Sequence, residues 1–165
     1  MSAVLDGNGD DFLAEIQNKR GSVVNWKTFC TWYSDLKGNT RAYGVFLYRV
    51  QDTFWYEDFE HQTQLLGIRL QKPKGAPPYV KFANSFSGCD VNRFFKVRKS
   101  LAQKVSEGLL PKEKLKESKS LSSLLFETVY GVELNSKDIL FFQVYDKTFA
   151  QLLEHYIKEN HNGSI

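Results

Sequence analysis

The sequence predicts an α+β fold, with a single domain built on a largely antiparallel sheet of about five strands and flanking amphipathic helices. Short segments rich in β-branched and aromatic residues alternate with turn signals, and other segments have the apolar spacing of amphipathic helices. A chain of 165 residues, 42% hydrophobic and 15% aromatic, is long enough to bury one sizeable core. We expect residues 10–160 to form this domain, after a flexible N-terminus at 1–9 and before a tail at 161–165.

The N-terminal part predicts one helix and two strands. Asp10 is a candidate N-cap for a short helix, and Gly21 is suited to end it. Residues 23–33, VVNWKTFCTWY, favour a strand because they are dense in β-branched and aromatic side chains. Residues 42–50, AYGVFLYRV, predict a strand that is apolar on both faces, as is typical of a central position in a sheet.

The next part is less regular. Residues 53–62, TFWYEDFEHQ, are interpreted as a strand end or an exposed loop. Residues 64–72 alternate apolar and polar side chains, which predicts a half-buried strand. An exposed Pro- and Lys-bearing loop then leads to a predicted strand at 79–83.

Residues 79–105 are interpreted as a strand, a glycine-containing turn and a basic amphipathic helix beginning near Asp90. At about 100° per residue, the helix would have an apolar face made of Val91, Phe94, Phe95, Leu101, Ala102 and Val105. Its outer face would carry Arg93, Lys96, Lys99 and Lys104. Arg98 would lie near the middle of the apolar face, where a cation must snorkel, pair with a carboxylate or face a bound anion.

The C-terminal part predicts two helices around one strand. A helix capped by Ser118 or Ser120 would bury Leu121, Leu124, Leu125 and Val129. Residues 139–145, ILFFQVY, predict a buried strand. Thr148 and Gln151 have the spacing of a capping box for the last helix.

Few residues of the sequence are candidates for catalysis or metal binding. No nucleophile, metalloprotease or nucleotide-binding motif is present, and two cysteines cannot make a disulfide framework. Cys89 would gain reactivity from a helix N-terminus, but Asp90 beside it opposes this. The acidic residues between Asp52 and Glu60, with His61, favour a solvated loop over a metal site. We therefore predict a protein that is not an enzyme and has no cofactor or bound metal.

No apolar run approaches the roughly 18 residues of a membrane-spanning helix, and the N-terminus lacks the pattern of a signal peptide. We expect an intracellular protein, nuclear or cytoplasmic. The net charge of +3 is small, but basic residues gather at 69–74, 93–104 and 112–119. The distribution of charge, more than its sum, therefore indicates a basic surface.

Binding to nucleic acid is the function that this pattern favours. Basic residues could neutralise phosphates while Phe86, Tyr79 or a tryptophan stacks on bases. The candidate phosphate-binding residues are Arg69, Lys72, Lys74, Lys81, Arg93, Lys96, Arg98, Lys99 and Lys104. We expect a non-enzymatic binding module, part of a complex, that contacts nucleic-acid phosphates with this basic region.

Two alternatives remain open. Abundant aromatic residues also suit a scaffold subunit that binds only proteins. The other alternative is a phosphoinositide-binding module, and it comes from the order of several short motifs along the chain. These are Tyr56-Glu57-Asp58-Phe59-Glu60, Pro77-Pro78, Lys81, Arg98 before Leu101, Pro111, and Leu124-Leu125-Phe126-Glu127. This order resembles that of phox-homology domains. That resemblance implies phosphoinositide binding through Lys81 and Arg98. The chain departs from the family pattern at Trp55, where the family has its phosphate-binding arginine.

Overall fold

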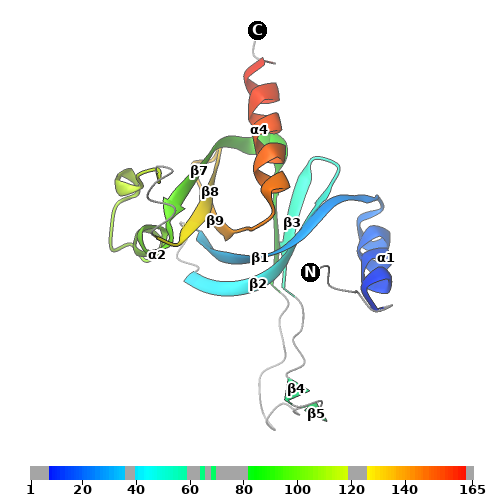
Figure 1. The fold of residues 1–165 in the computed structure, drawn as a ribbon. Helices are drawn as coiled ribbons and strands as arrows, with labels where there is room; N and C mark the ends of the chain where they lie inside the picture. The colour runs from blue at the N-terminus through cyan, green and yellow to red at the C-terminus, as the bar shows by residue number, and fades with distance from the viewer. Residues whose placement is uncertain are drawn as a thin grey trace.

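The computed structural model describes residues 8–35, 40–58, 64–65, 68–69, 82–118 and 126–162. Its main feature is one antiparallel sheet of seven strands (Figure 1). The strands are β1 (Val24–Asp35), β2 (Thr40–Val50), β3 (Thr53–Glu57), β6 (Ala83–Ser87), β7 (Val91–Arg98), β8 (Thr128–Leu134) and β9 (Ile139–Gln143). The α+β class and the antiparallel sheet are confirmed, whereas the expectation of about five strands is wrong.

The sheet is curved, and its two edge strands approach each other where the chain passes from one to the other. The strand order is β6-β3-β2-β1-β9-β8-β7, so β6 and β7 lie at opposite edges. These two strands are nevertheless consecutive in the chain and are joined only by the 3₁₀ turn η1 (Gly88–Asp90). The strong curvature gives the sheet a concave inner face and a convex outer face.

The concave face holds the main core, to which every strand of the sheet contributes. Phe54, Val91 and Phe142 are examples of its buried side chains. Helix α4 (Lys147–Asn162) packs against this face through Phe149 and Leu153, both 0% exposed. The C-terminal helix therefore covers part of the concave face.

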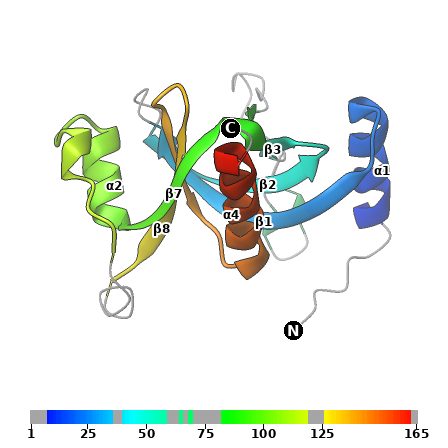
Figure 2. The same cartoon turned by 90° about the horizontal axis from the view of Figure 1, so that it is seen from above.

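The convex face is covered in two places by helices α1 (Asn8–Arg20) and α2 (Lys99–Ser106). Figure 2 shows them on opposite sides of the molecule, with α4 between them. Helix α1 packs on the side chains of β2 and β3, and α2 covers those of β7, β8 and β9. The basic segment of interest thus runs along an edge strand and continues into a helix on the convex face.

The predicted basic helix from Asp90 is wrong, because residues 91–98 form strand β7 and only residues from Lys99 onward are helical. The aromatic and β-branched content of VNRFFKVR favours a strand. Strand β7 is apolar on both faces: Phe94 stacks on Tyr130 at the concave side, while Phe95 lies under α2. Arg98 is consequently an exposed residue at the end of a strand, outside any apolar helix face.

Three predicted strands are confirmed, and one predicted helix is wrong. The strands predicted at 23–33, 42–50 and 139–145 are confirmed as β1, β2 and β9, and Gly21 ends α1 with φ +66°. Strand β8 begins at Thr128, so a helix that includes Val129 is wrong; Ser120, Leu121, Leu124 and Leu125 lie outside the described residues.

Other predictions agree only in part with the structure, or fall only in part on the described residues. Residues 53–57 form strand β3, which is paired on both sides. Strand β6 begins at Ala83, the last residue of the strand predicted at 79–83, and residues 79–81 lie outside the described part of the chain. Within 64–72, the structure describes only the short antiparallel strands β4 (Gln64–Leu65) and β5 (Ile68–Arg69). Asp146, rather than Thr148, caps α4, because its Oδ1 accepts from the Thr148 backbone N–H.

Candidate nucleic-acid interface

The predicted cations whose side chains the structure describes all lie on β7 or α2. They are Arg93, Lys96, Arg98, Lys99 and Lys104. Arg69 belongs to β5, but its side chain lies outside the described part of the chain, as do Lys72, Lys74 and Lys81. The candidate interface is therefore built from β7, α2 and the side chains that contact them.

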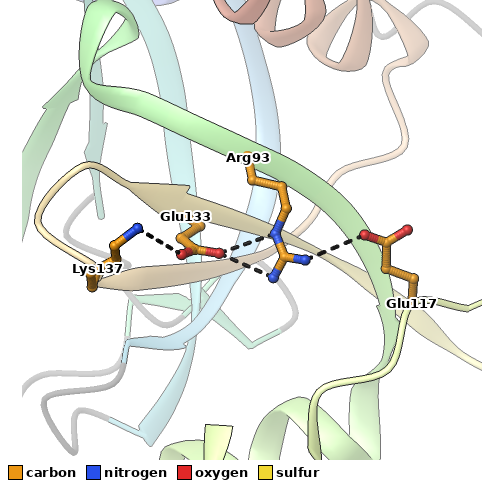
Figure 3. Close-up of polar contacts among 4 residues, drawn as sticks. All are labelled: Arg93, Glu117, Glu133 and Lys137. Atoms are coloured by element: carbon orange, nitrogen blue, oxygen red, sulfur yellow. Dashed lines mark hydrogen bonds and ion pairs between the residues drawn. The ribbon is translucent and has the colours of Figure 1, made fainter. Parts of the chain in front are cut away.

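Arg93 is held in a charge network (Figure 3). Its Nε and Nη2 both lie 3.1 Å from Oε2 of Glu133 on β8, and its Nη1 lies 3.7 Å from Oε1 of Glu117. Lys137 lies 3.9 Å from the other oxygen of Glu133. The guanidinium also covers the ring of Phe95 at 4.5 Å. Arg93 thus has carboxylate partners on two sides and is less suited to bind an external phosphate.

Lys99 is also neutralised. Its Nζ donates to Oε2 of Glu127 at 2.9 Å and lies 4.7 Å from the centre of the Tyr33 ring. Hydrogen bonds to Tyr33 and Glu127 raise the pKa of Lys99 to about 12. The backbone N–H of Lys99 donates to the Glu127 carbonyl as well, so this residue ties the start of α2 to the strand next to β7.

Lys96 and Arg98 differ from these two cations. Both are exposed, and neither contacts a carboxylate in the described part of the chain. Instead, Nζ of Lys96 lies 5.2 Å from the centre of the Tyr130 ring, and Cζ of Arg98 lies 3.9 Å from that of Phe126. As alternate residues of one strand they point to the same face, about 7 Å apart along β7. An aromatic face attracts a cation but carries no net charge to neutralise it.

We call Lys96, Arg98, Tyr130 and Phe126 the Lys96–Arg98 site. Lys104 is exposed in the last turn of α2, where a cation is favoured by the helix dipole. No contact within the described residues joins Lys104 to this site. The structure therefore separates the basic residues of β7 and α2 into neutralised, unneutralised and isolated positions, a distinction that the sequence does not reveal.

The aromatic residues that the sequence offered for stacking on bases are mostly core residues. Phe86 is 5% exposed and stacks on Phe54, and Trp32 is 1% exposed; Tyr79 lies outside the described residues. Phe126, which sequence reasoning assigned no such role, is 48% exposed and lies against Arg98. No sequence signal distinguishes it, since its partner is 28 positions away in the chain.

Among the residues that the structure describes, the acidic side chains of 52–58 and Cys89 form no shared cluster of metal-ligating groups. Glu57 and Asp58 are buried, which corrects the expectation of a solvated loop. Oε1 of Glu57 accepts from Tyr48 Oη at 2.6 Å, and Oδ1 of Asp58 accepts from the Phe82 backbone N–H at 2.8 Å. Cys89 is exposed on η1, a turn of three residues rather than a full helix.

Within the residues described, no group of three or more His, Cys, Asp or Glu side chains is placed to hold a metal. His61 and Glu60 lie outside that part of the chain. Among the described helices, none combines the length and the apolar character needed to cross a membrane.

Comparisons with known proteins give little. No family model matches the chain, and no curated protein matches it. One similar solved structure is described as the C-terminal domain of an unknown protein from Leishmania infantum. It is 12% identical, with a TM-score of 0.46, over 92% of this chain and 99% of that one. A similarity this distant gives no information on function.

Proposed function

We propose that this protein is a non-enzymatic binding module, working within a complex, that contacts nucleic-acid phosphates through the Lys96–Arg98 site. The observation that carries the proposal is the pair of exposed cations on one face of β7 with no carboxylate partner among the described residues. Binding of phosphates to such cations releases counterions from the nucleic acid, which favours association.

The arrangement of the two cations favours a linear polyanion. They follow each other along a strand, whereas recognition of one isolated phosphate group would favour cations that converge on a point. Arg98 can form a bidentate hydrogen-bonded pair with a phosphate. Its contact with the Phe126 ring restricts the guanidinium before binding, which lowers the entropy that ordering it would cost.

The test is the affinity for a labelled oligonucleotide at low salt, measured by fluorescence anisotropy. Loss of a charge-assisted hydrogen bond costs about 1.5 to 3 kcal/mol, so Arg98→Met should weaken binding roughly 10- to 150-fold. Lys158→Met is the matched control. Lys158 is exposed on α4 close to Asn160, which contacts the carbonyl oxygens of Cys89 and Val91 at the opposite end of β7.

Equal losses in the Arg98 and Lys158 variants would mean that only overall charge matters, and would contradict the proposed site. Liposomes with and without phosphoinositides belong in the same experiment. Retention on phosphoinositide liposomes without binding to oligonucleotides would replace nucleic acid by a lipid headgroup as the ligand. Binding to neither would leave the protein scaffold as the better description.

A further inference from the structure

We infer that the nucleic acid at the Lys96–Arg98 site is single-stranded and that one of its bases stacks at Phe126. This inference rests on the proposed function and deepens it by naming the class of ligand. It starts from an aromatic side chain that the core does not use: Phe126 is 48% exposed, whereas Phe95 on the neighbouring strand is 4% exposed.

The Phe126 ring lies against the Arg98 guanidinium, a group that can bind phosphates and stack on bases. The guanidinium carbon of Arg98 lies 3.9 Å from its centroid, so the cation covers one side of the ring. Nearly half of the residue remains accessible. Aromatic rings and arginine guanidinium planes are the two surfaces on which proteins stack unpaired bases. Ring and cation together offer both surfaces at one position.

The backbone segments that carry this ring and this cation are fixed to one another. Lys99, the residue after Arg98, donates its backbone N–H to the carbonyl of Glu127, the residue after Phe126, at 2.9 Å. The side chains of Lys99 and Glu127 form an ion pair at 2.9 Å. Beyond this point, Arg98 is the register partner of Thr128 in the β7–β8 ladder. The stacking surface is therefore pre-organised, so that little backbone ordering is required when a base binds.

The placement of the second cation extends the site along the strand. Lys96 is the register partner of Tyr130 and contacts its ring, just as Arg98 contacts Phe126. Tyr130 already stacks on Phe94, with ring centroids 4.8 Å apart, and so has less free surface for a base. The geometry points to a strand with phosphates at Lys96 and Arg98 and one base at Phe126. Bases inside a duplex are stacked on each other and cannot reach this ring.

The experiment compares three probes: an oligothymidylate, a strand of the same length with abasic sites throughout, and a duplex of the same length. Stacking of a base on an aromatic side chain strengthens binding roughly 5- to 150-fold. The wild-type protein should bind oligothymidylate more tightly than the abasic strand by a factor in this range, and more tightly than the duplex. Phe126→Ala should bind oligothymidylate and the abasic strand equally, whereas Phe126→Tyr should retain the preference.

The outcomes separate this inference from the proposed function. Equal binding of oligothymidylate and the abasic strand by the wild-type protein overturns the stacking inference while the phosphate contacts stand. Tighter binding of the duplex overturns the single-strand assignment in the same way. A preference that persists in Phe126→Ala places the base elsewhere and refutes the role of Phe126. Failure of every probe to bind at low salt refutes the proposed function itself.

Discussion

Replacement of Gly131 by alanine tests the placement of β7 more sharply than any other single change. Gly131 is buried on β8 directly opposite Phe95. A Cβ atom at position 131 would lie 2.6 Å from Cζ and 2.8 Å from Cε2 of the Phe95 ring, far inside van der Waals contact. The ring cannot move away easily, since it packs with Val97 and Phe141 beneath α2.

Overpacking of this kind costs about 1 to 3 kcal/mol. For a domain of this length, each kcal/mol lowers the Tm by roughly 2 to 4 °C, so Gly131→Ala should lower it by roughly 2 to 12 °C. Thermal unfolding followed by circular dichroism gives the shift. Phe95→Leu removes the outer ring atoms, so the alanine should cost less in that background, with a coupling of about 0.5 kcal/mol or more.

Gly44→Ala is the matched control for the loss of a strand glycine. Gly44 lies in β2, is exposed and has open space at its Cβ position. Alanine there should leave the Tm unchanged or raise it, since glycine costs roughly 0.5 to 1 kcal/mol of backbone entropy relative to alanine. If Gly131→Ala is as stable as the wild-type protein and shows no coupling to Phe95, the β7–β8 register is wrong.

Three further predictions concern stability. Arg93→Met should cost about 1 kcal/mol or less, because the Arg93 side chain is 50% exposed and Glu133 keeps Lys137 as a partner. It should leave oligonucleotide affinity unchanged; a binding loss as large as that of Arg98→Met would contradict its structural role. The Ser106 hydroxyl donates to the Ala102 carbonyl and accepts from the buried Ser34 hydroxyl at 2.6 Å. Ser106→Ala leaves Ser34 without this partner, so it should lower the free energy of unfolding, measured by urea titration, by about 1 to 3 kcal/mol. An unchanged free energy of unfolding would contradict the Ser34–Ser106 hydrogen bond. Burial, and then hydrogen bonds to carboxylates, raise the pKa of Tyr48 and of Tyr156 from 10.0 to about 12. The two tyrosines therefore lose their protons at lower pH in the unfolded chain than in the folded protein. Their contribution to the free energy of unfolding is fully present below pH 10 and is lost as the pH rises towards 12. A constant Tm between pH 9 and 11 would refute this.

The fold was predictable where one signal dominated. Residues 42–50 and 139–145 combine β-branched and aromatic residues in runs too short for a helix, and both are strands. Strand β7 was missed because it carries apolar residues on both faces. Val91, Phe94 and Phe95 have the i, i+3, i+4 spacing that also occurs on a helix, and the alternation of buried and exposed residues is limited to Phe95–Arg98. Its residue composition was the better guide.

The candidate site was predictable only as a set of basic residues. Whether a cation is neutralised depends on carboxylates that are distant in sequence: Glu133 is 40 positions from Arg93, and Glu127 is 28 positions from Lys99. These pairs form because β8 lies beside β7, a neighbour relationship that local sequence does not contain. The role of Phe126 depends on the same pairing.

The salt dependence of binding tests the central claim, that Lys96 and Arg98 contact phosphates, most directly. For a single strand, log K falls with log salt by about 0.7 for each neutralised phosphate. The double variant Lys96→Met/Arg98→Met should therefore have a slope about 1.4 smaller in magnitude than the wild-type protein, whatever other cations contribute. The Lys158→Met slope should equal that of the wild-type protein. An unchanged slope in the double variant, or an equal decrease in the Lys158 variant, would contradict the account.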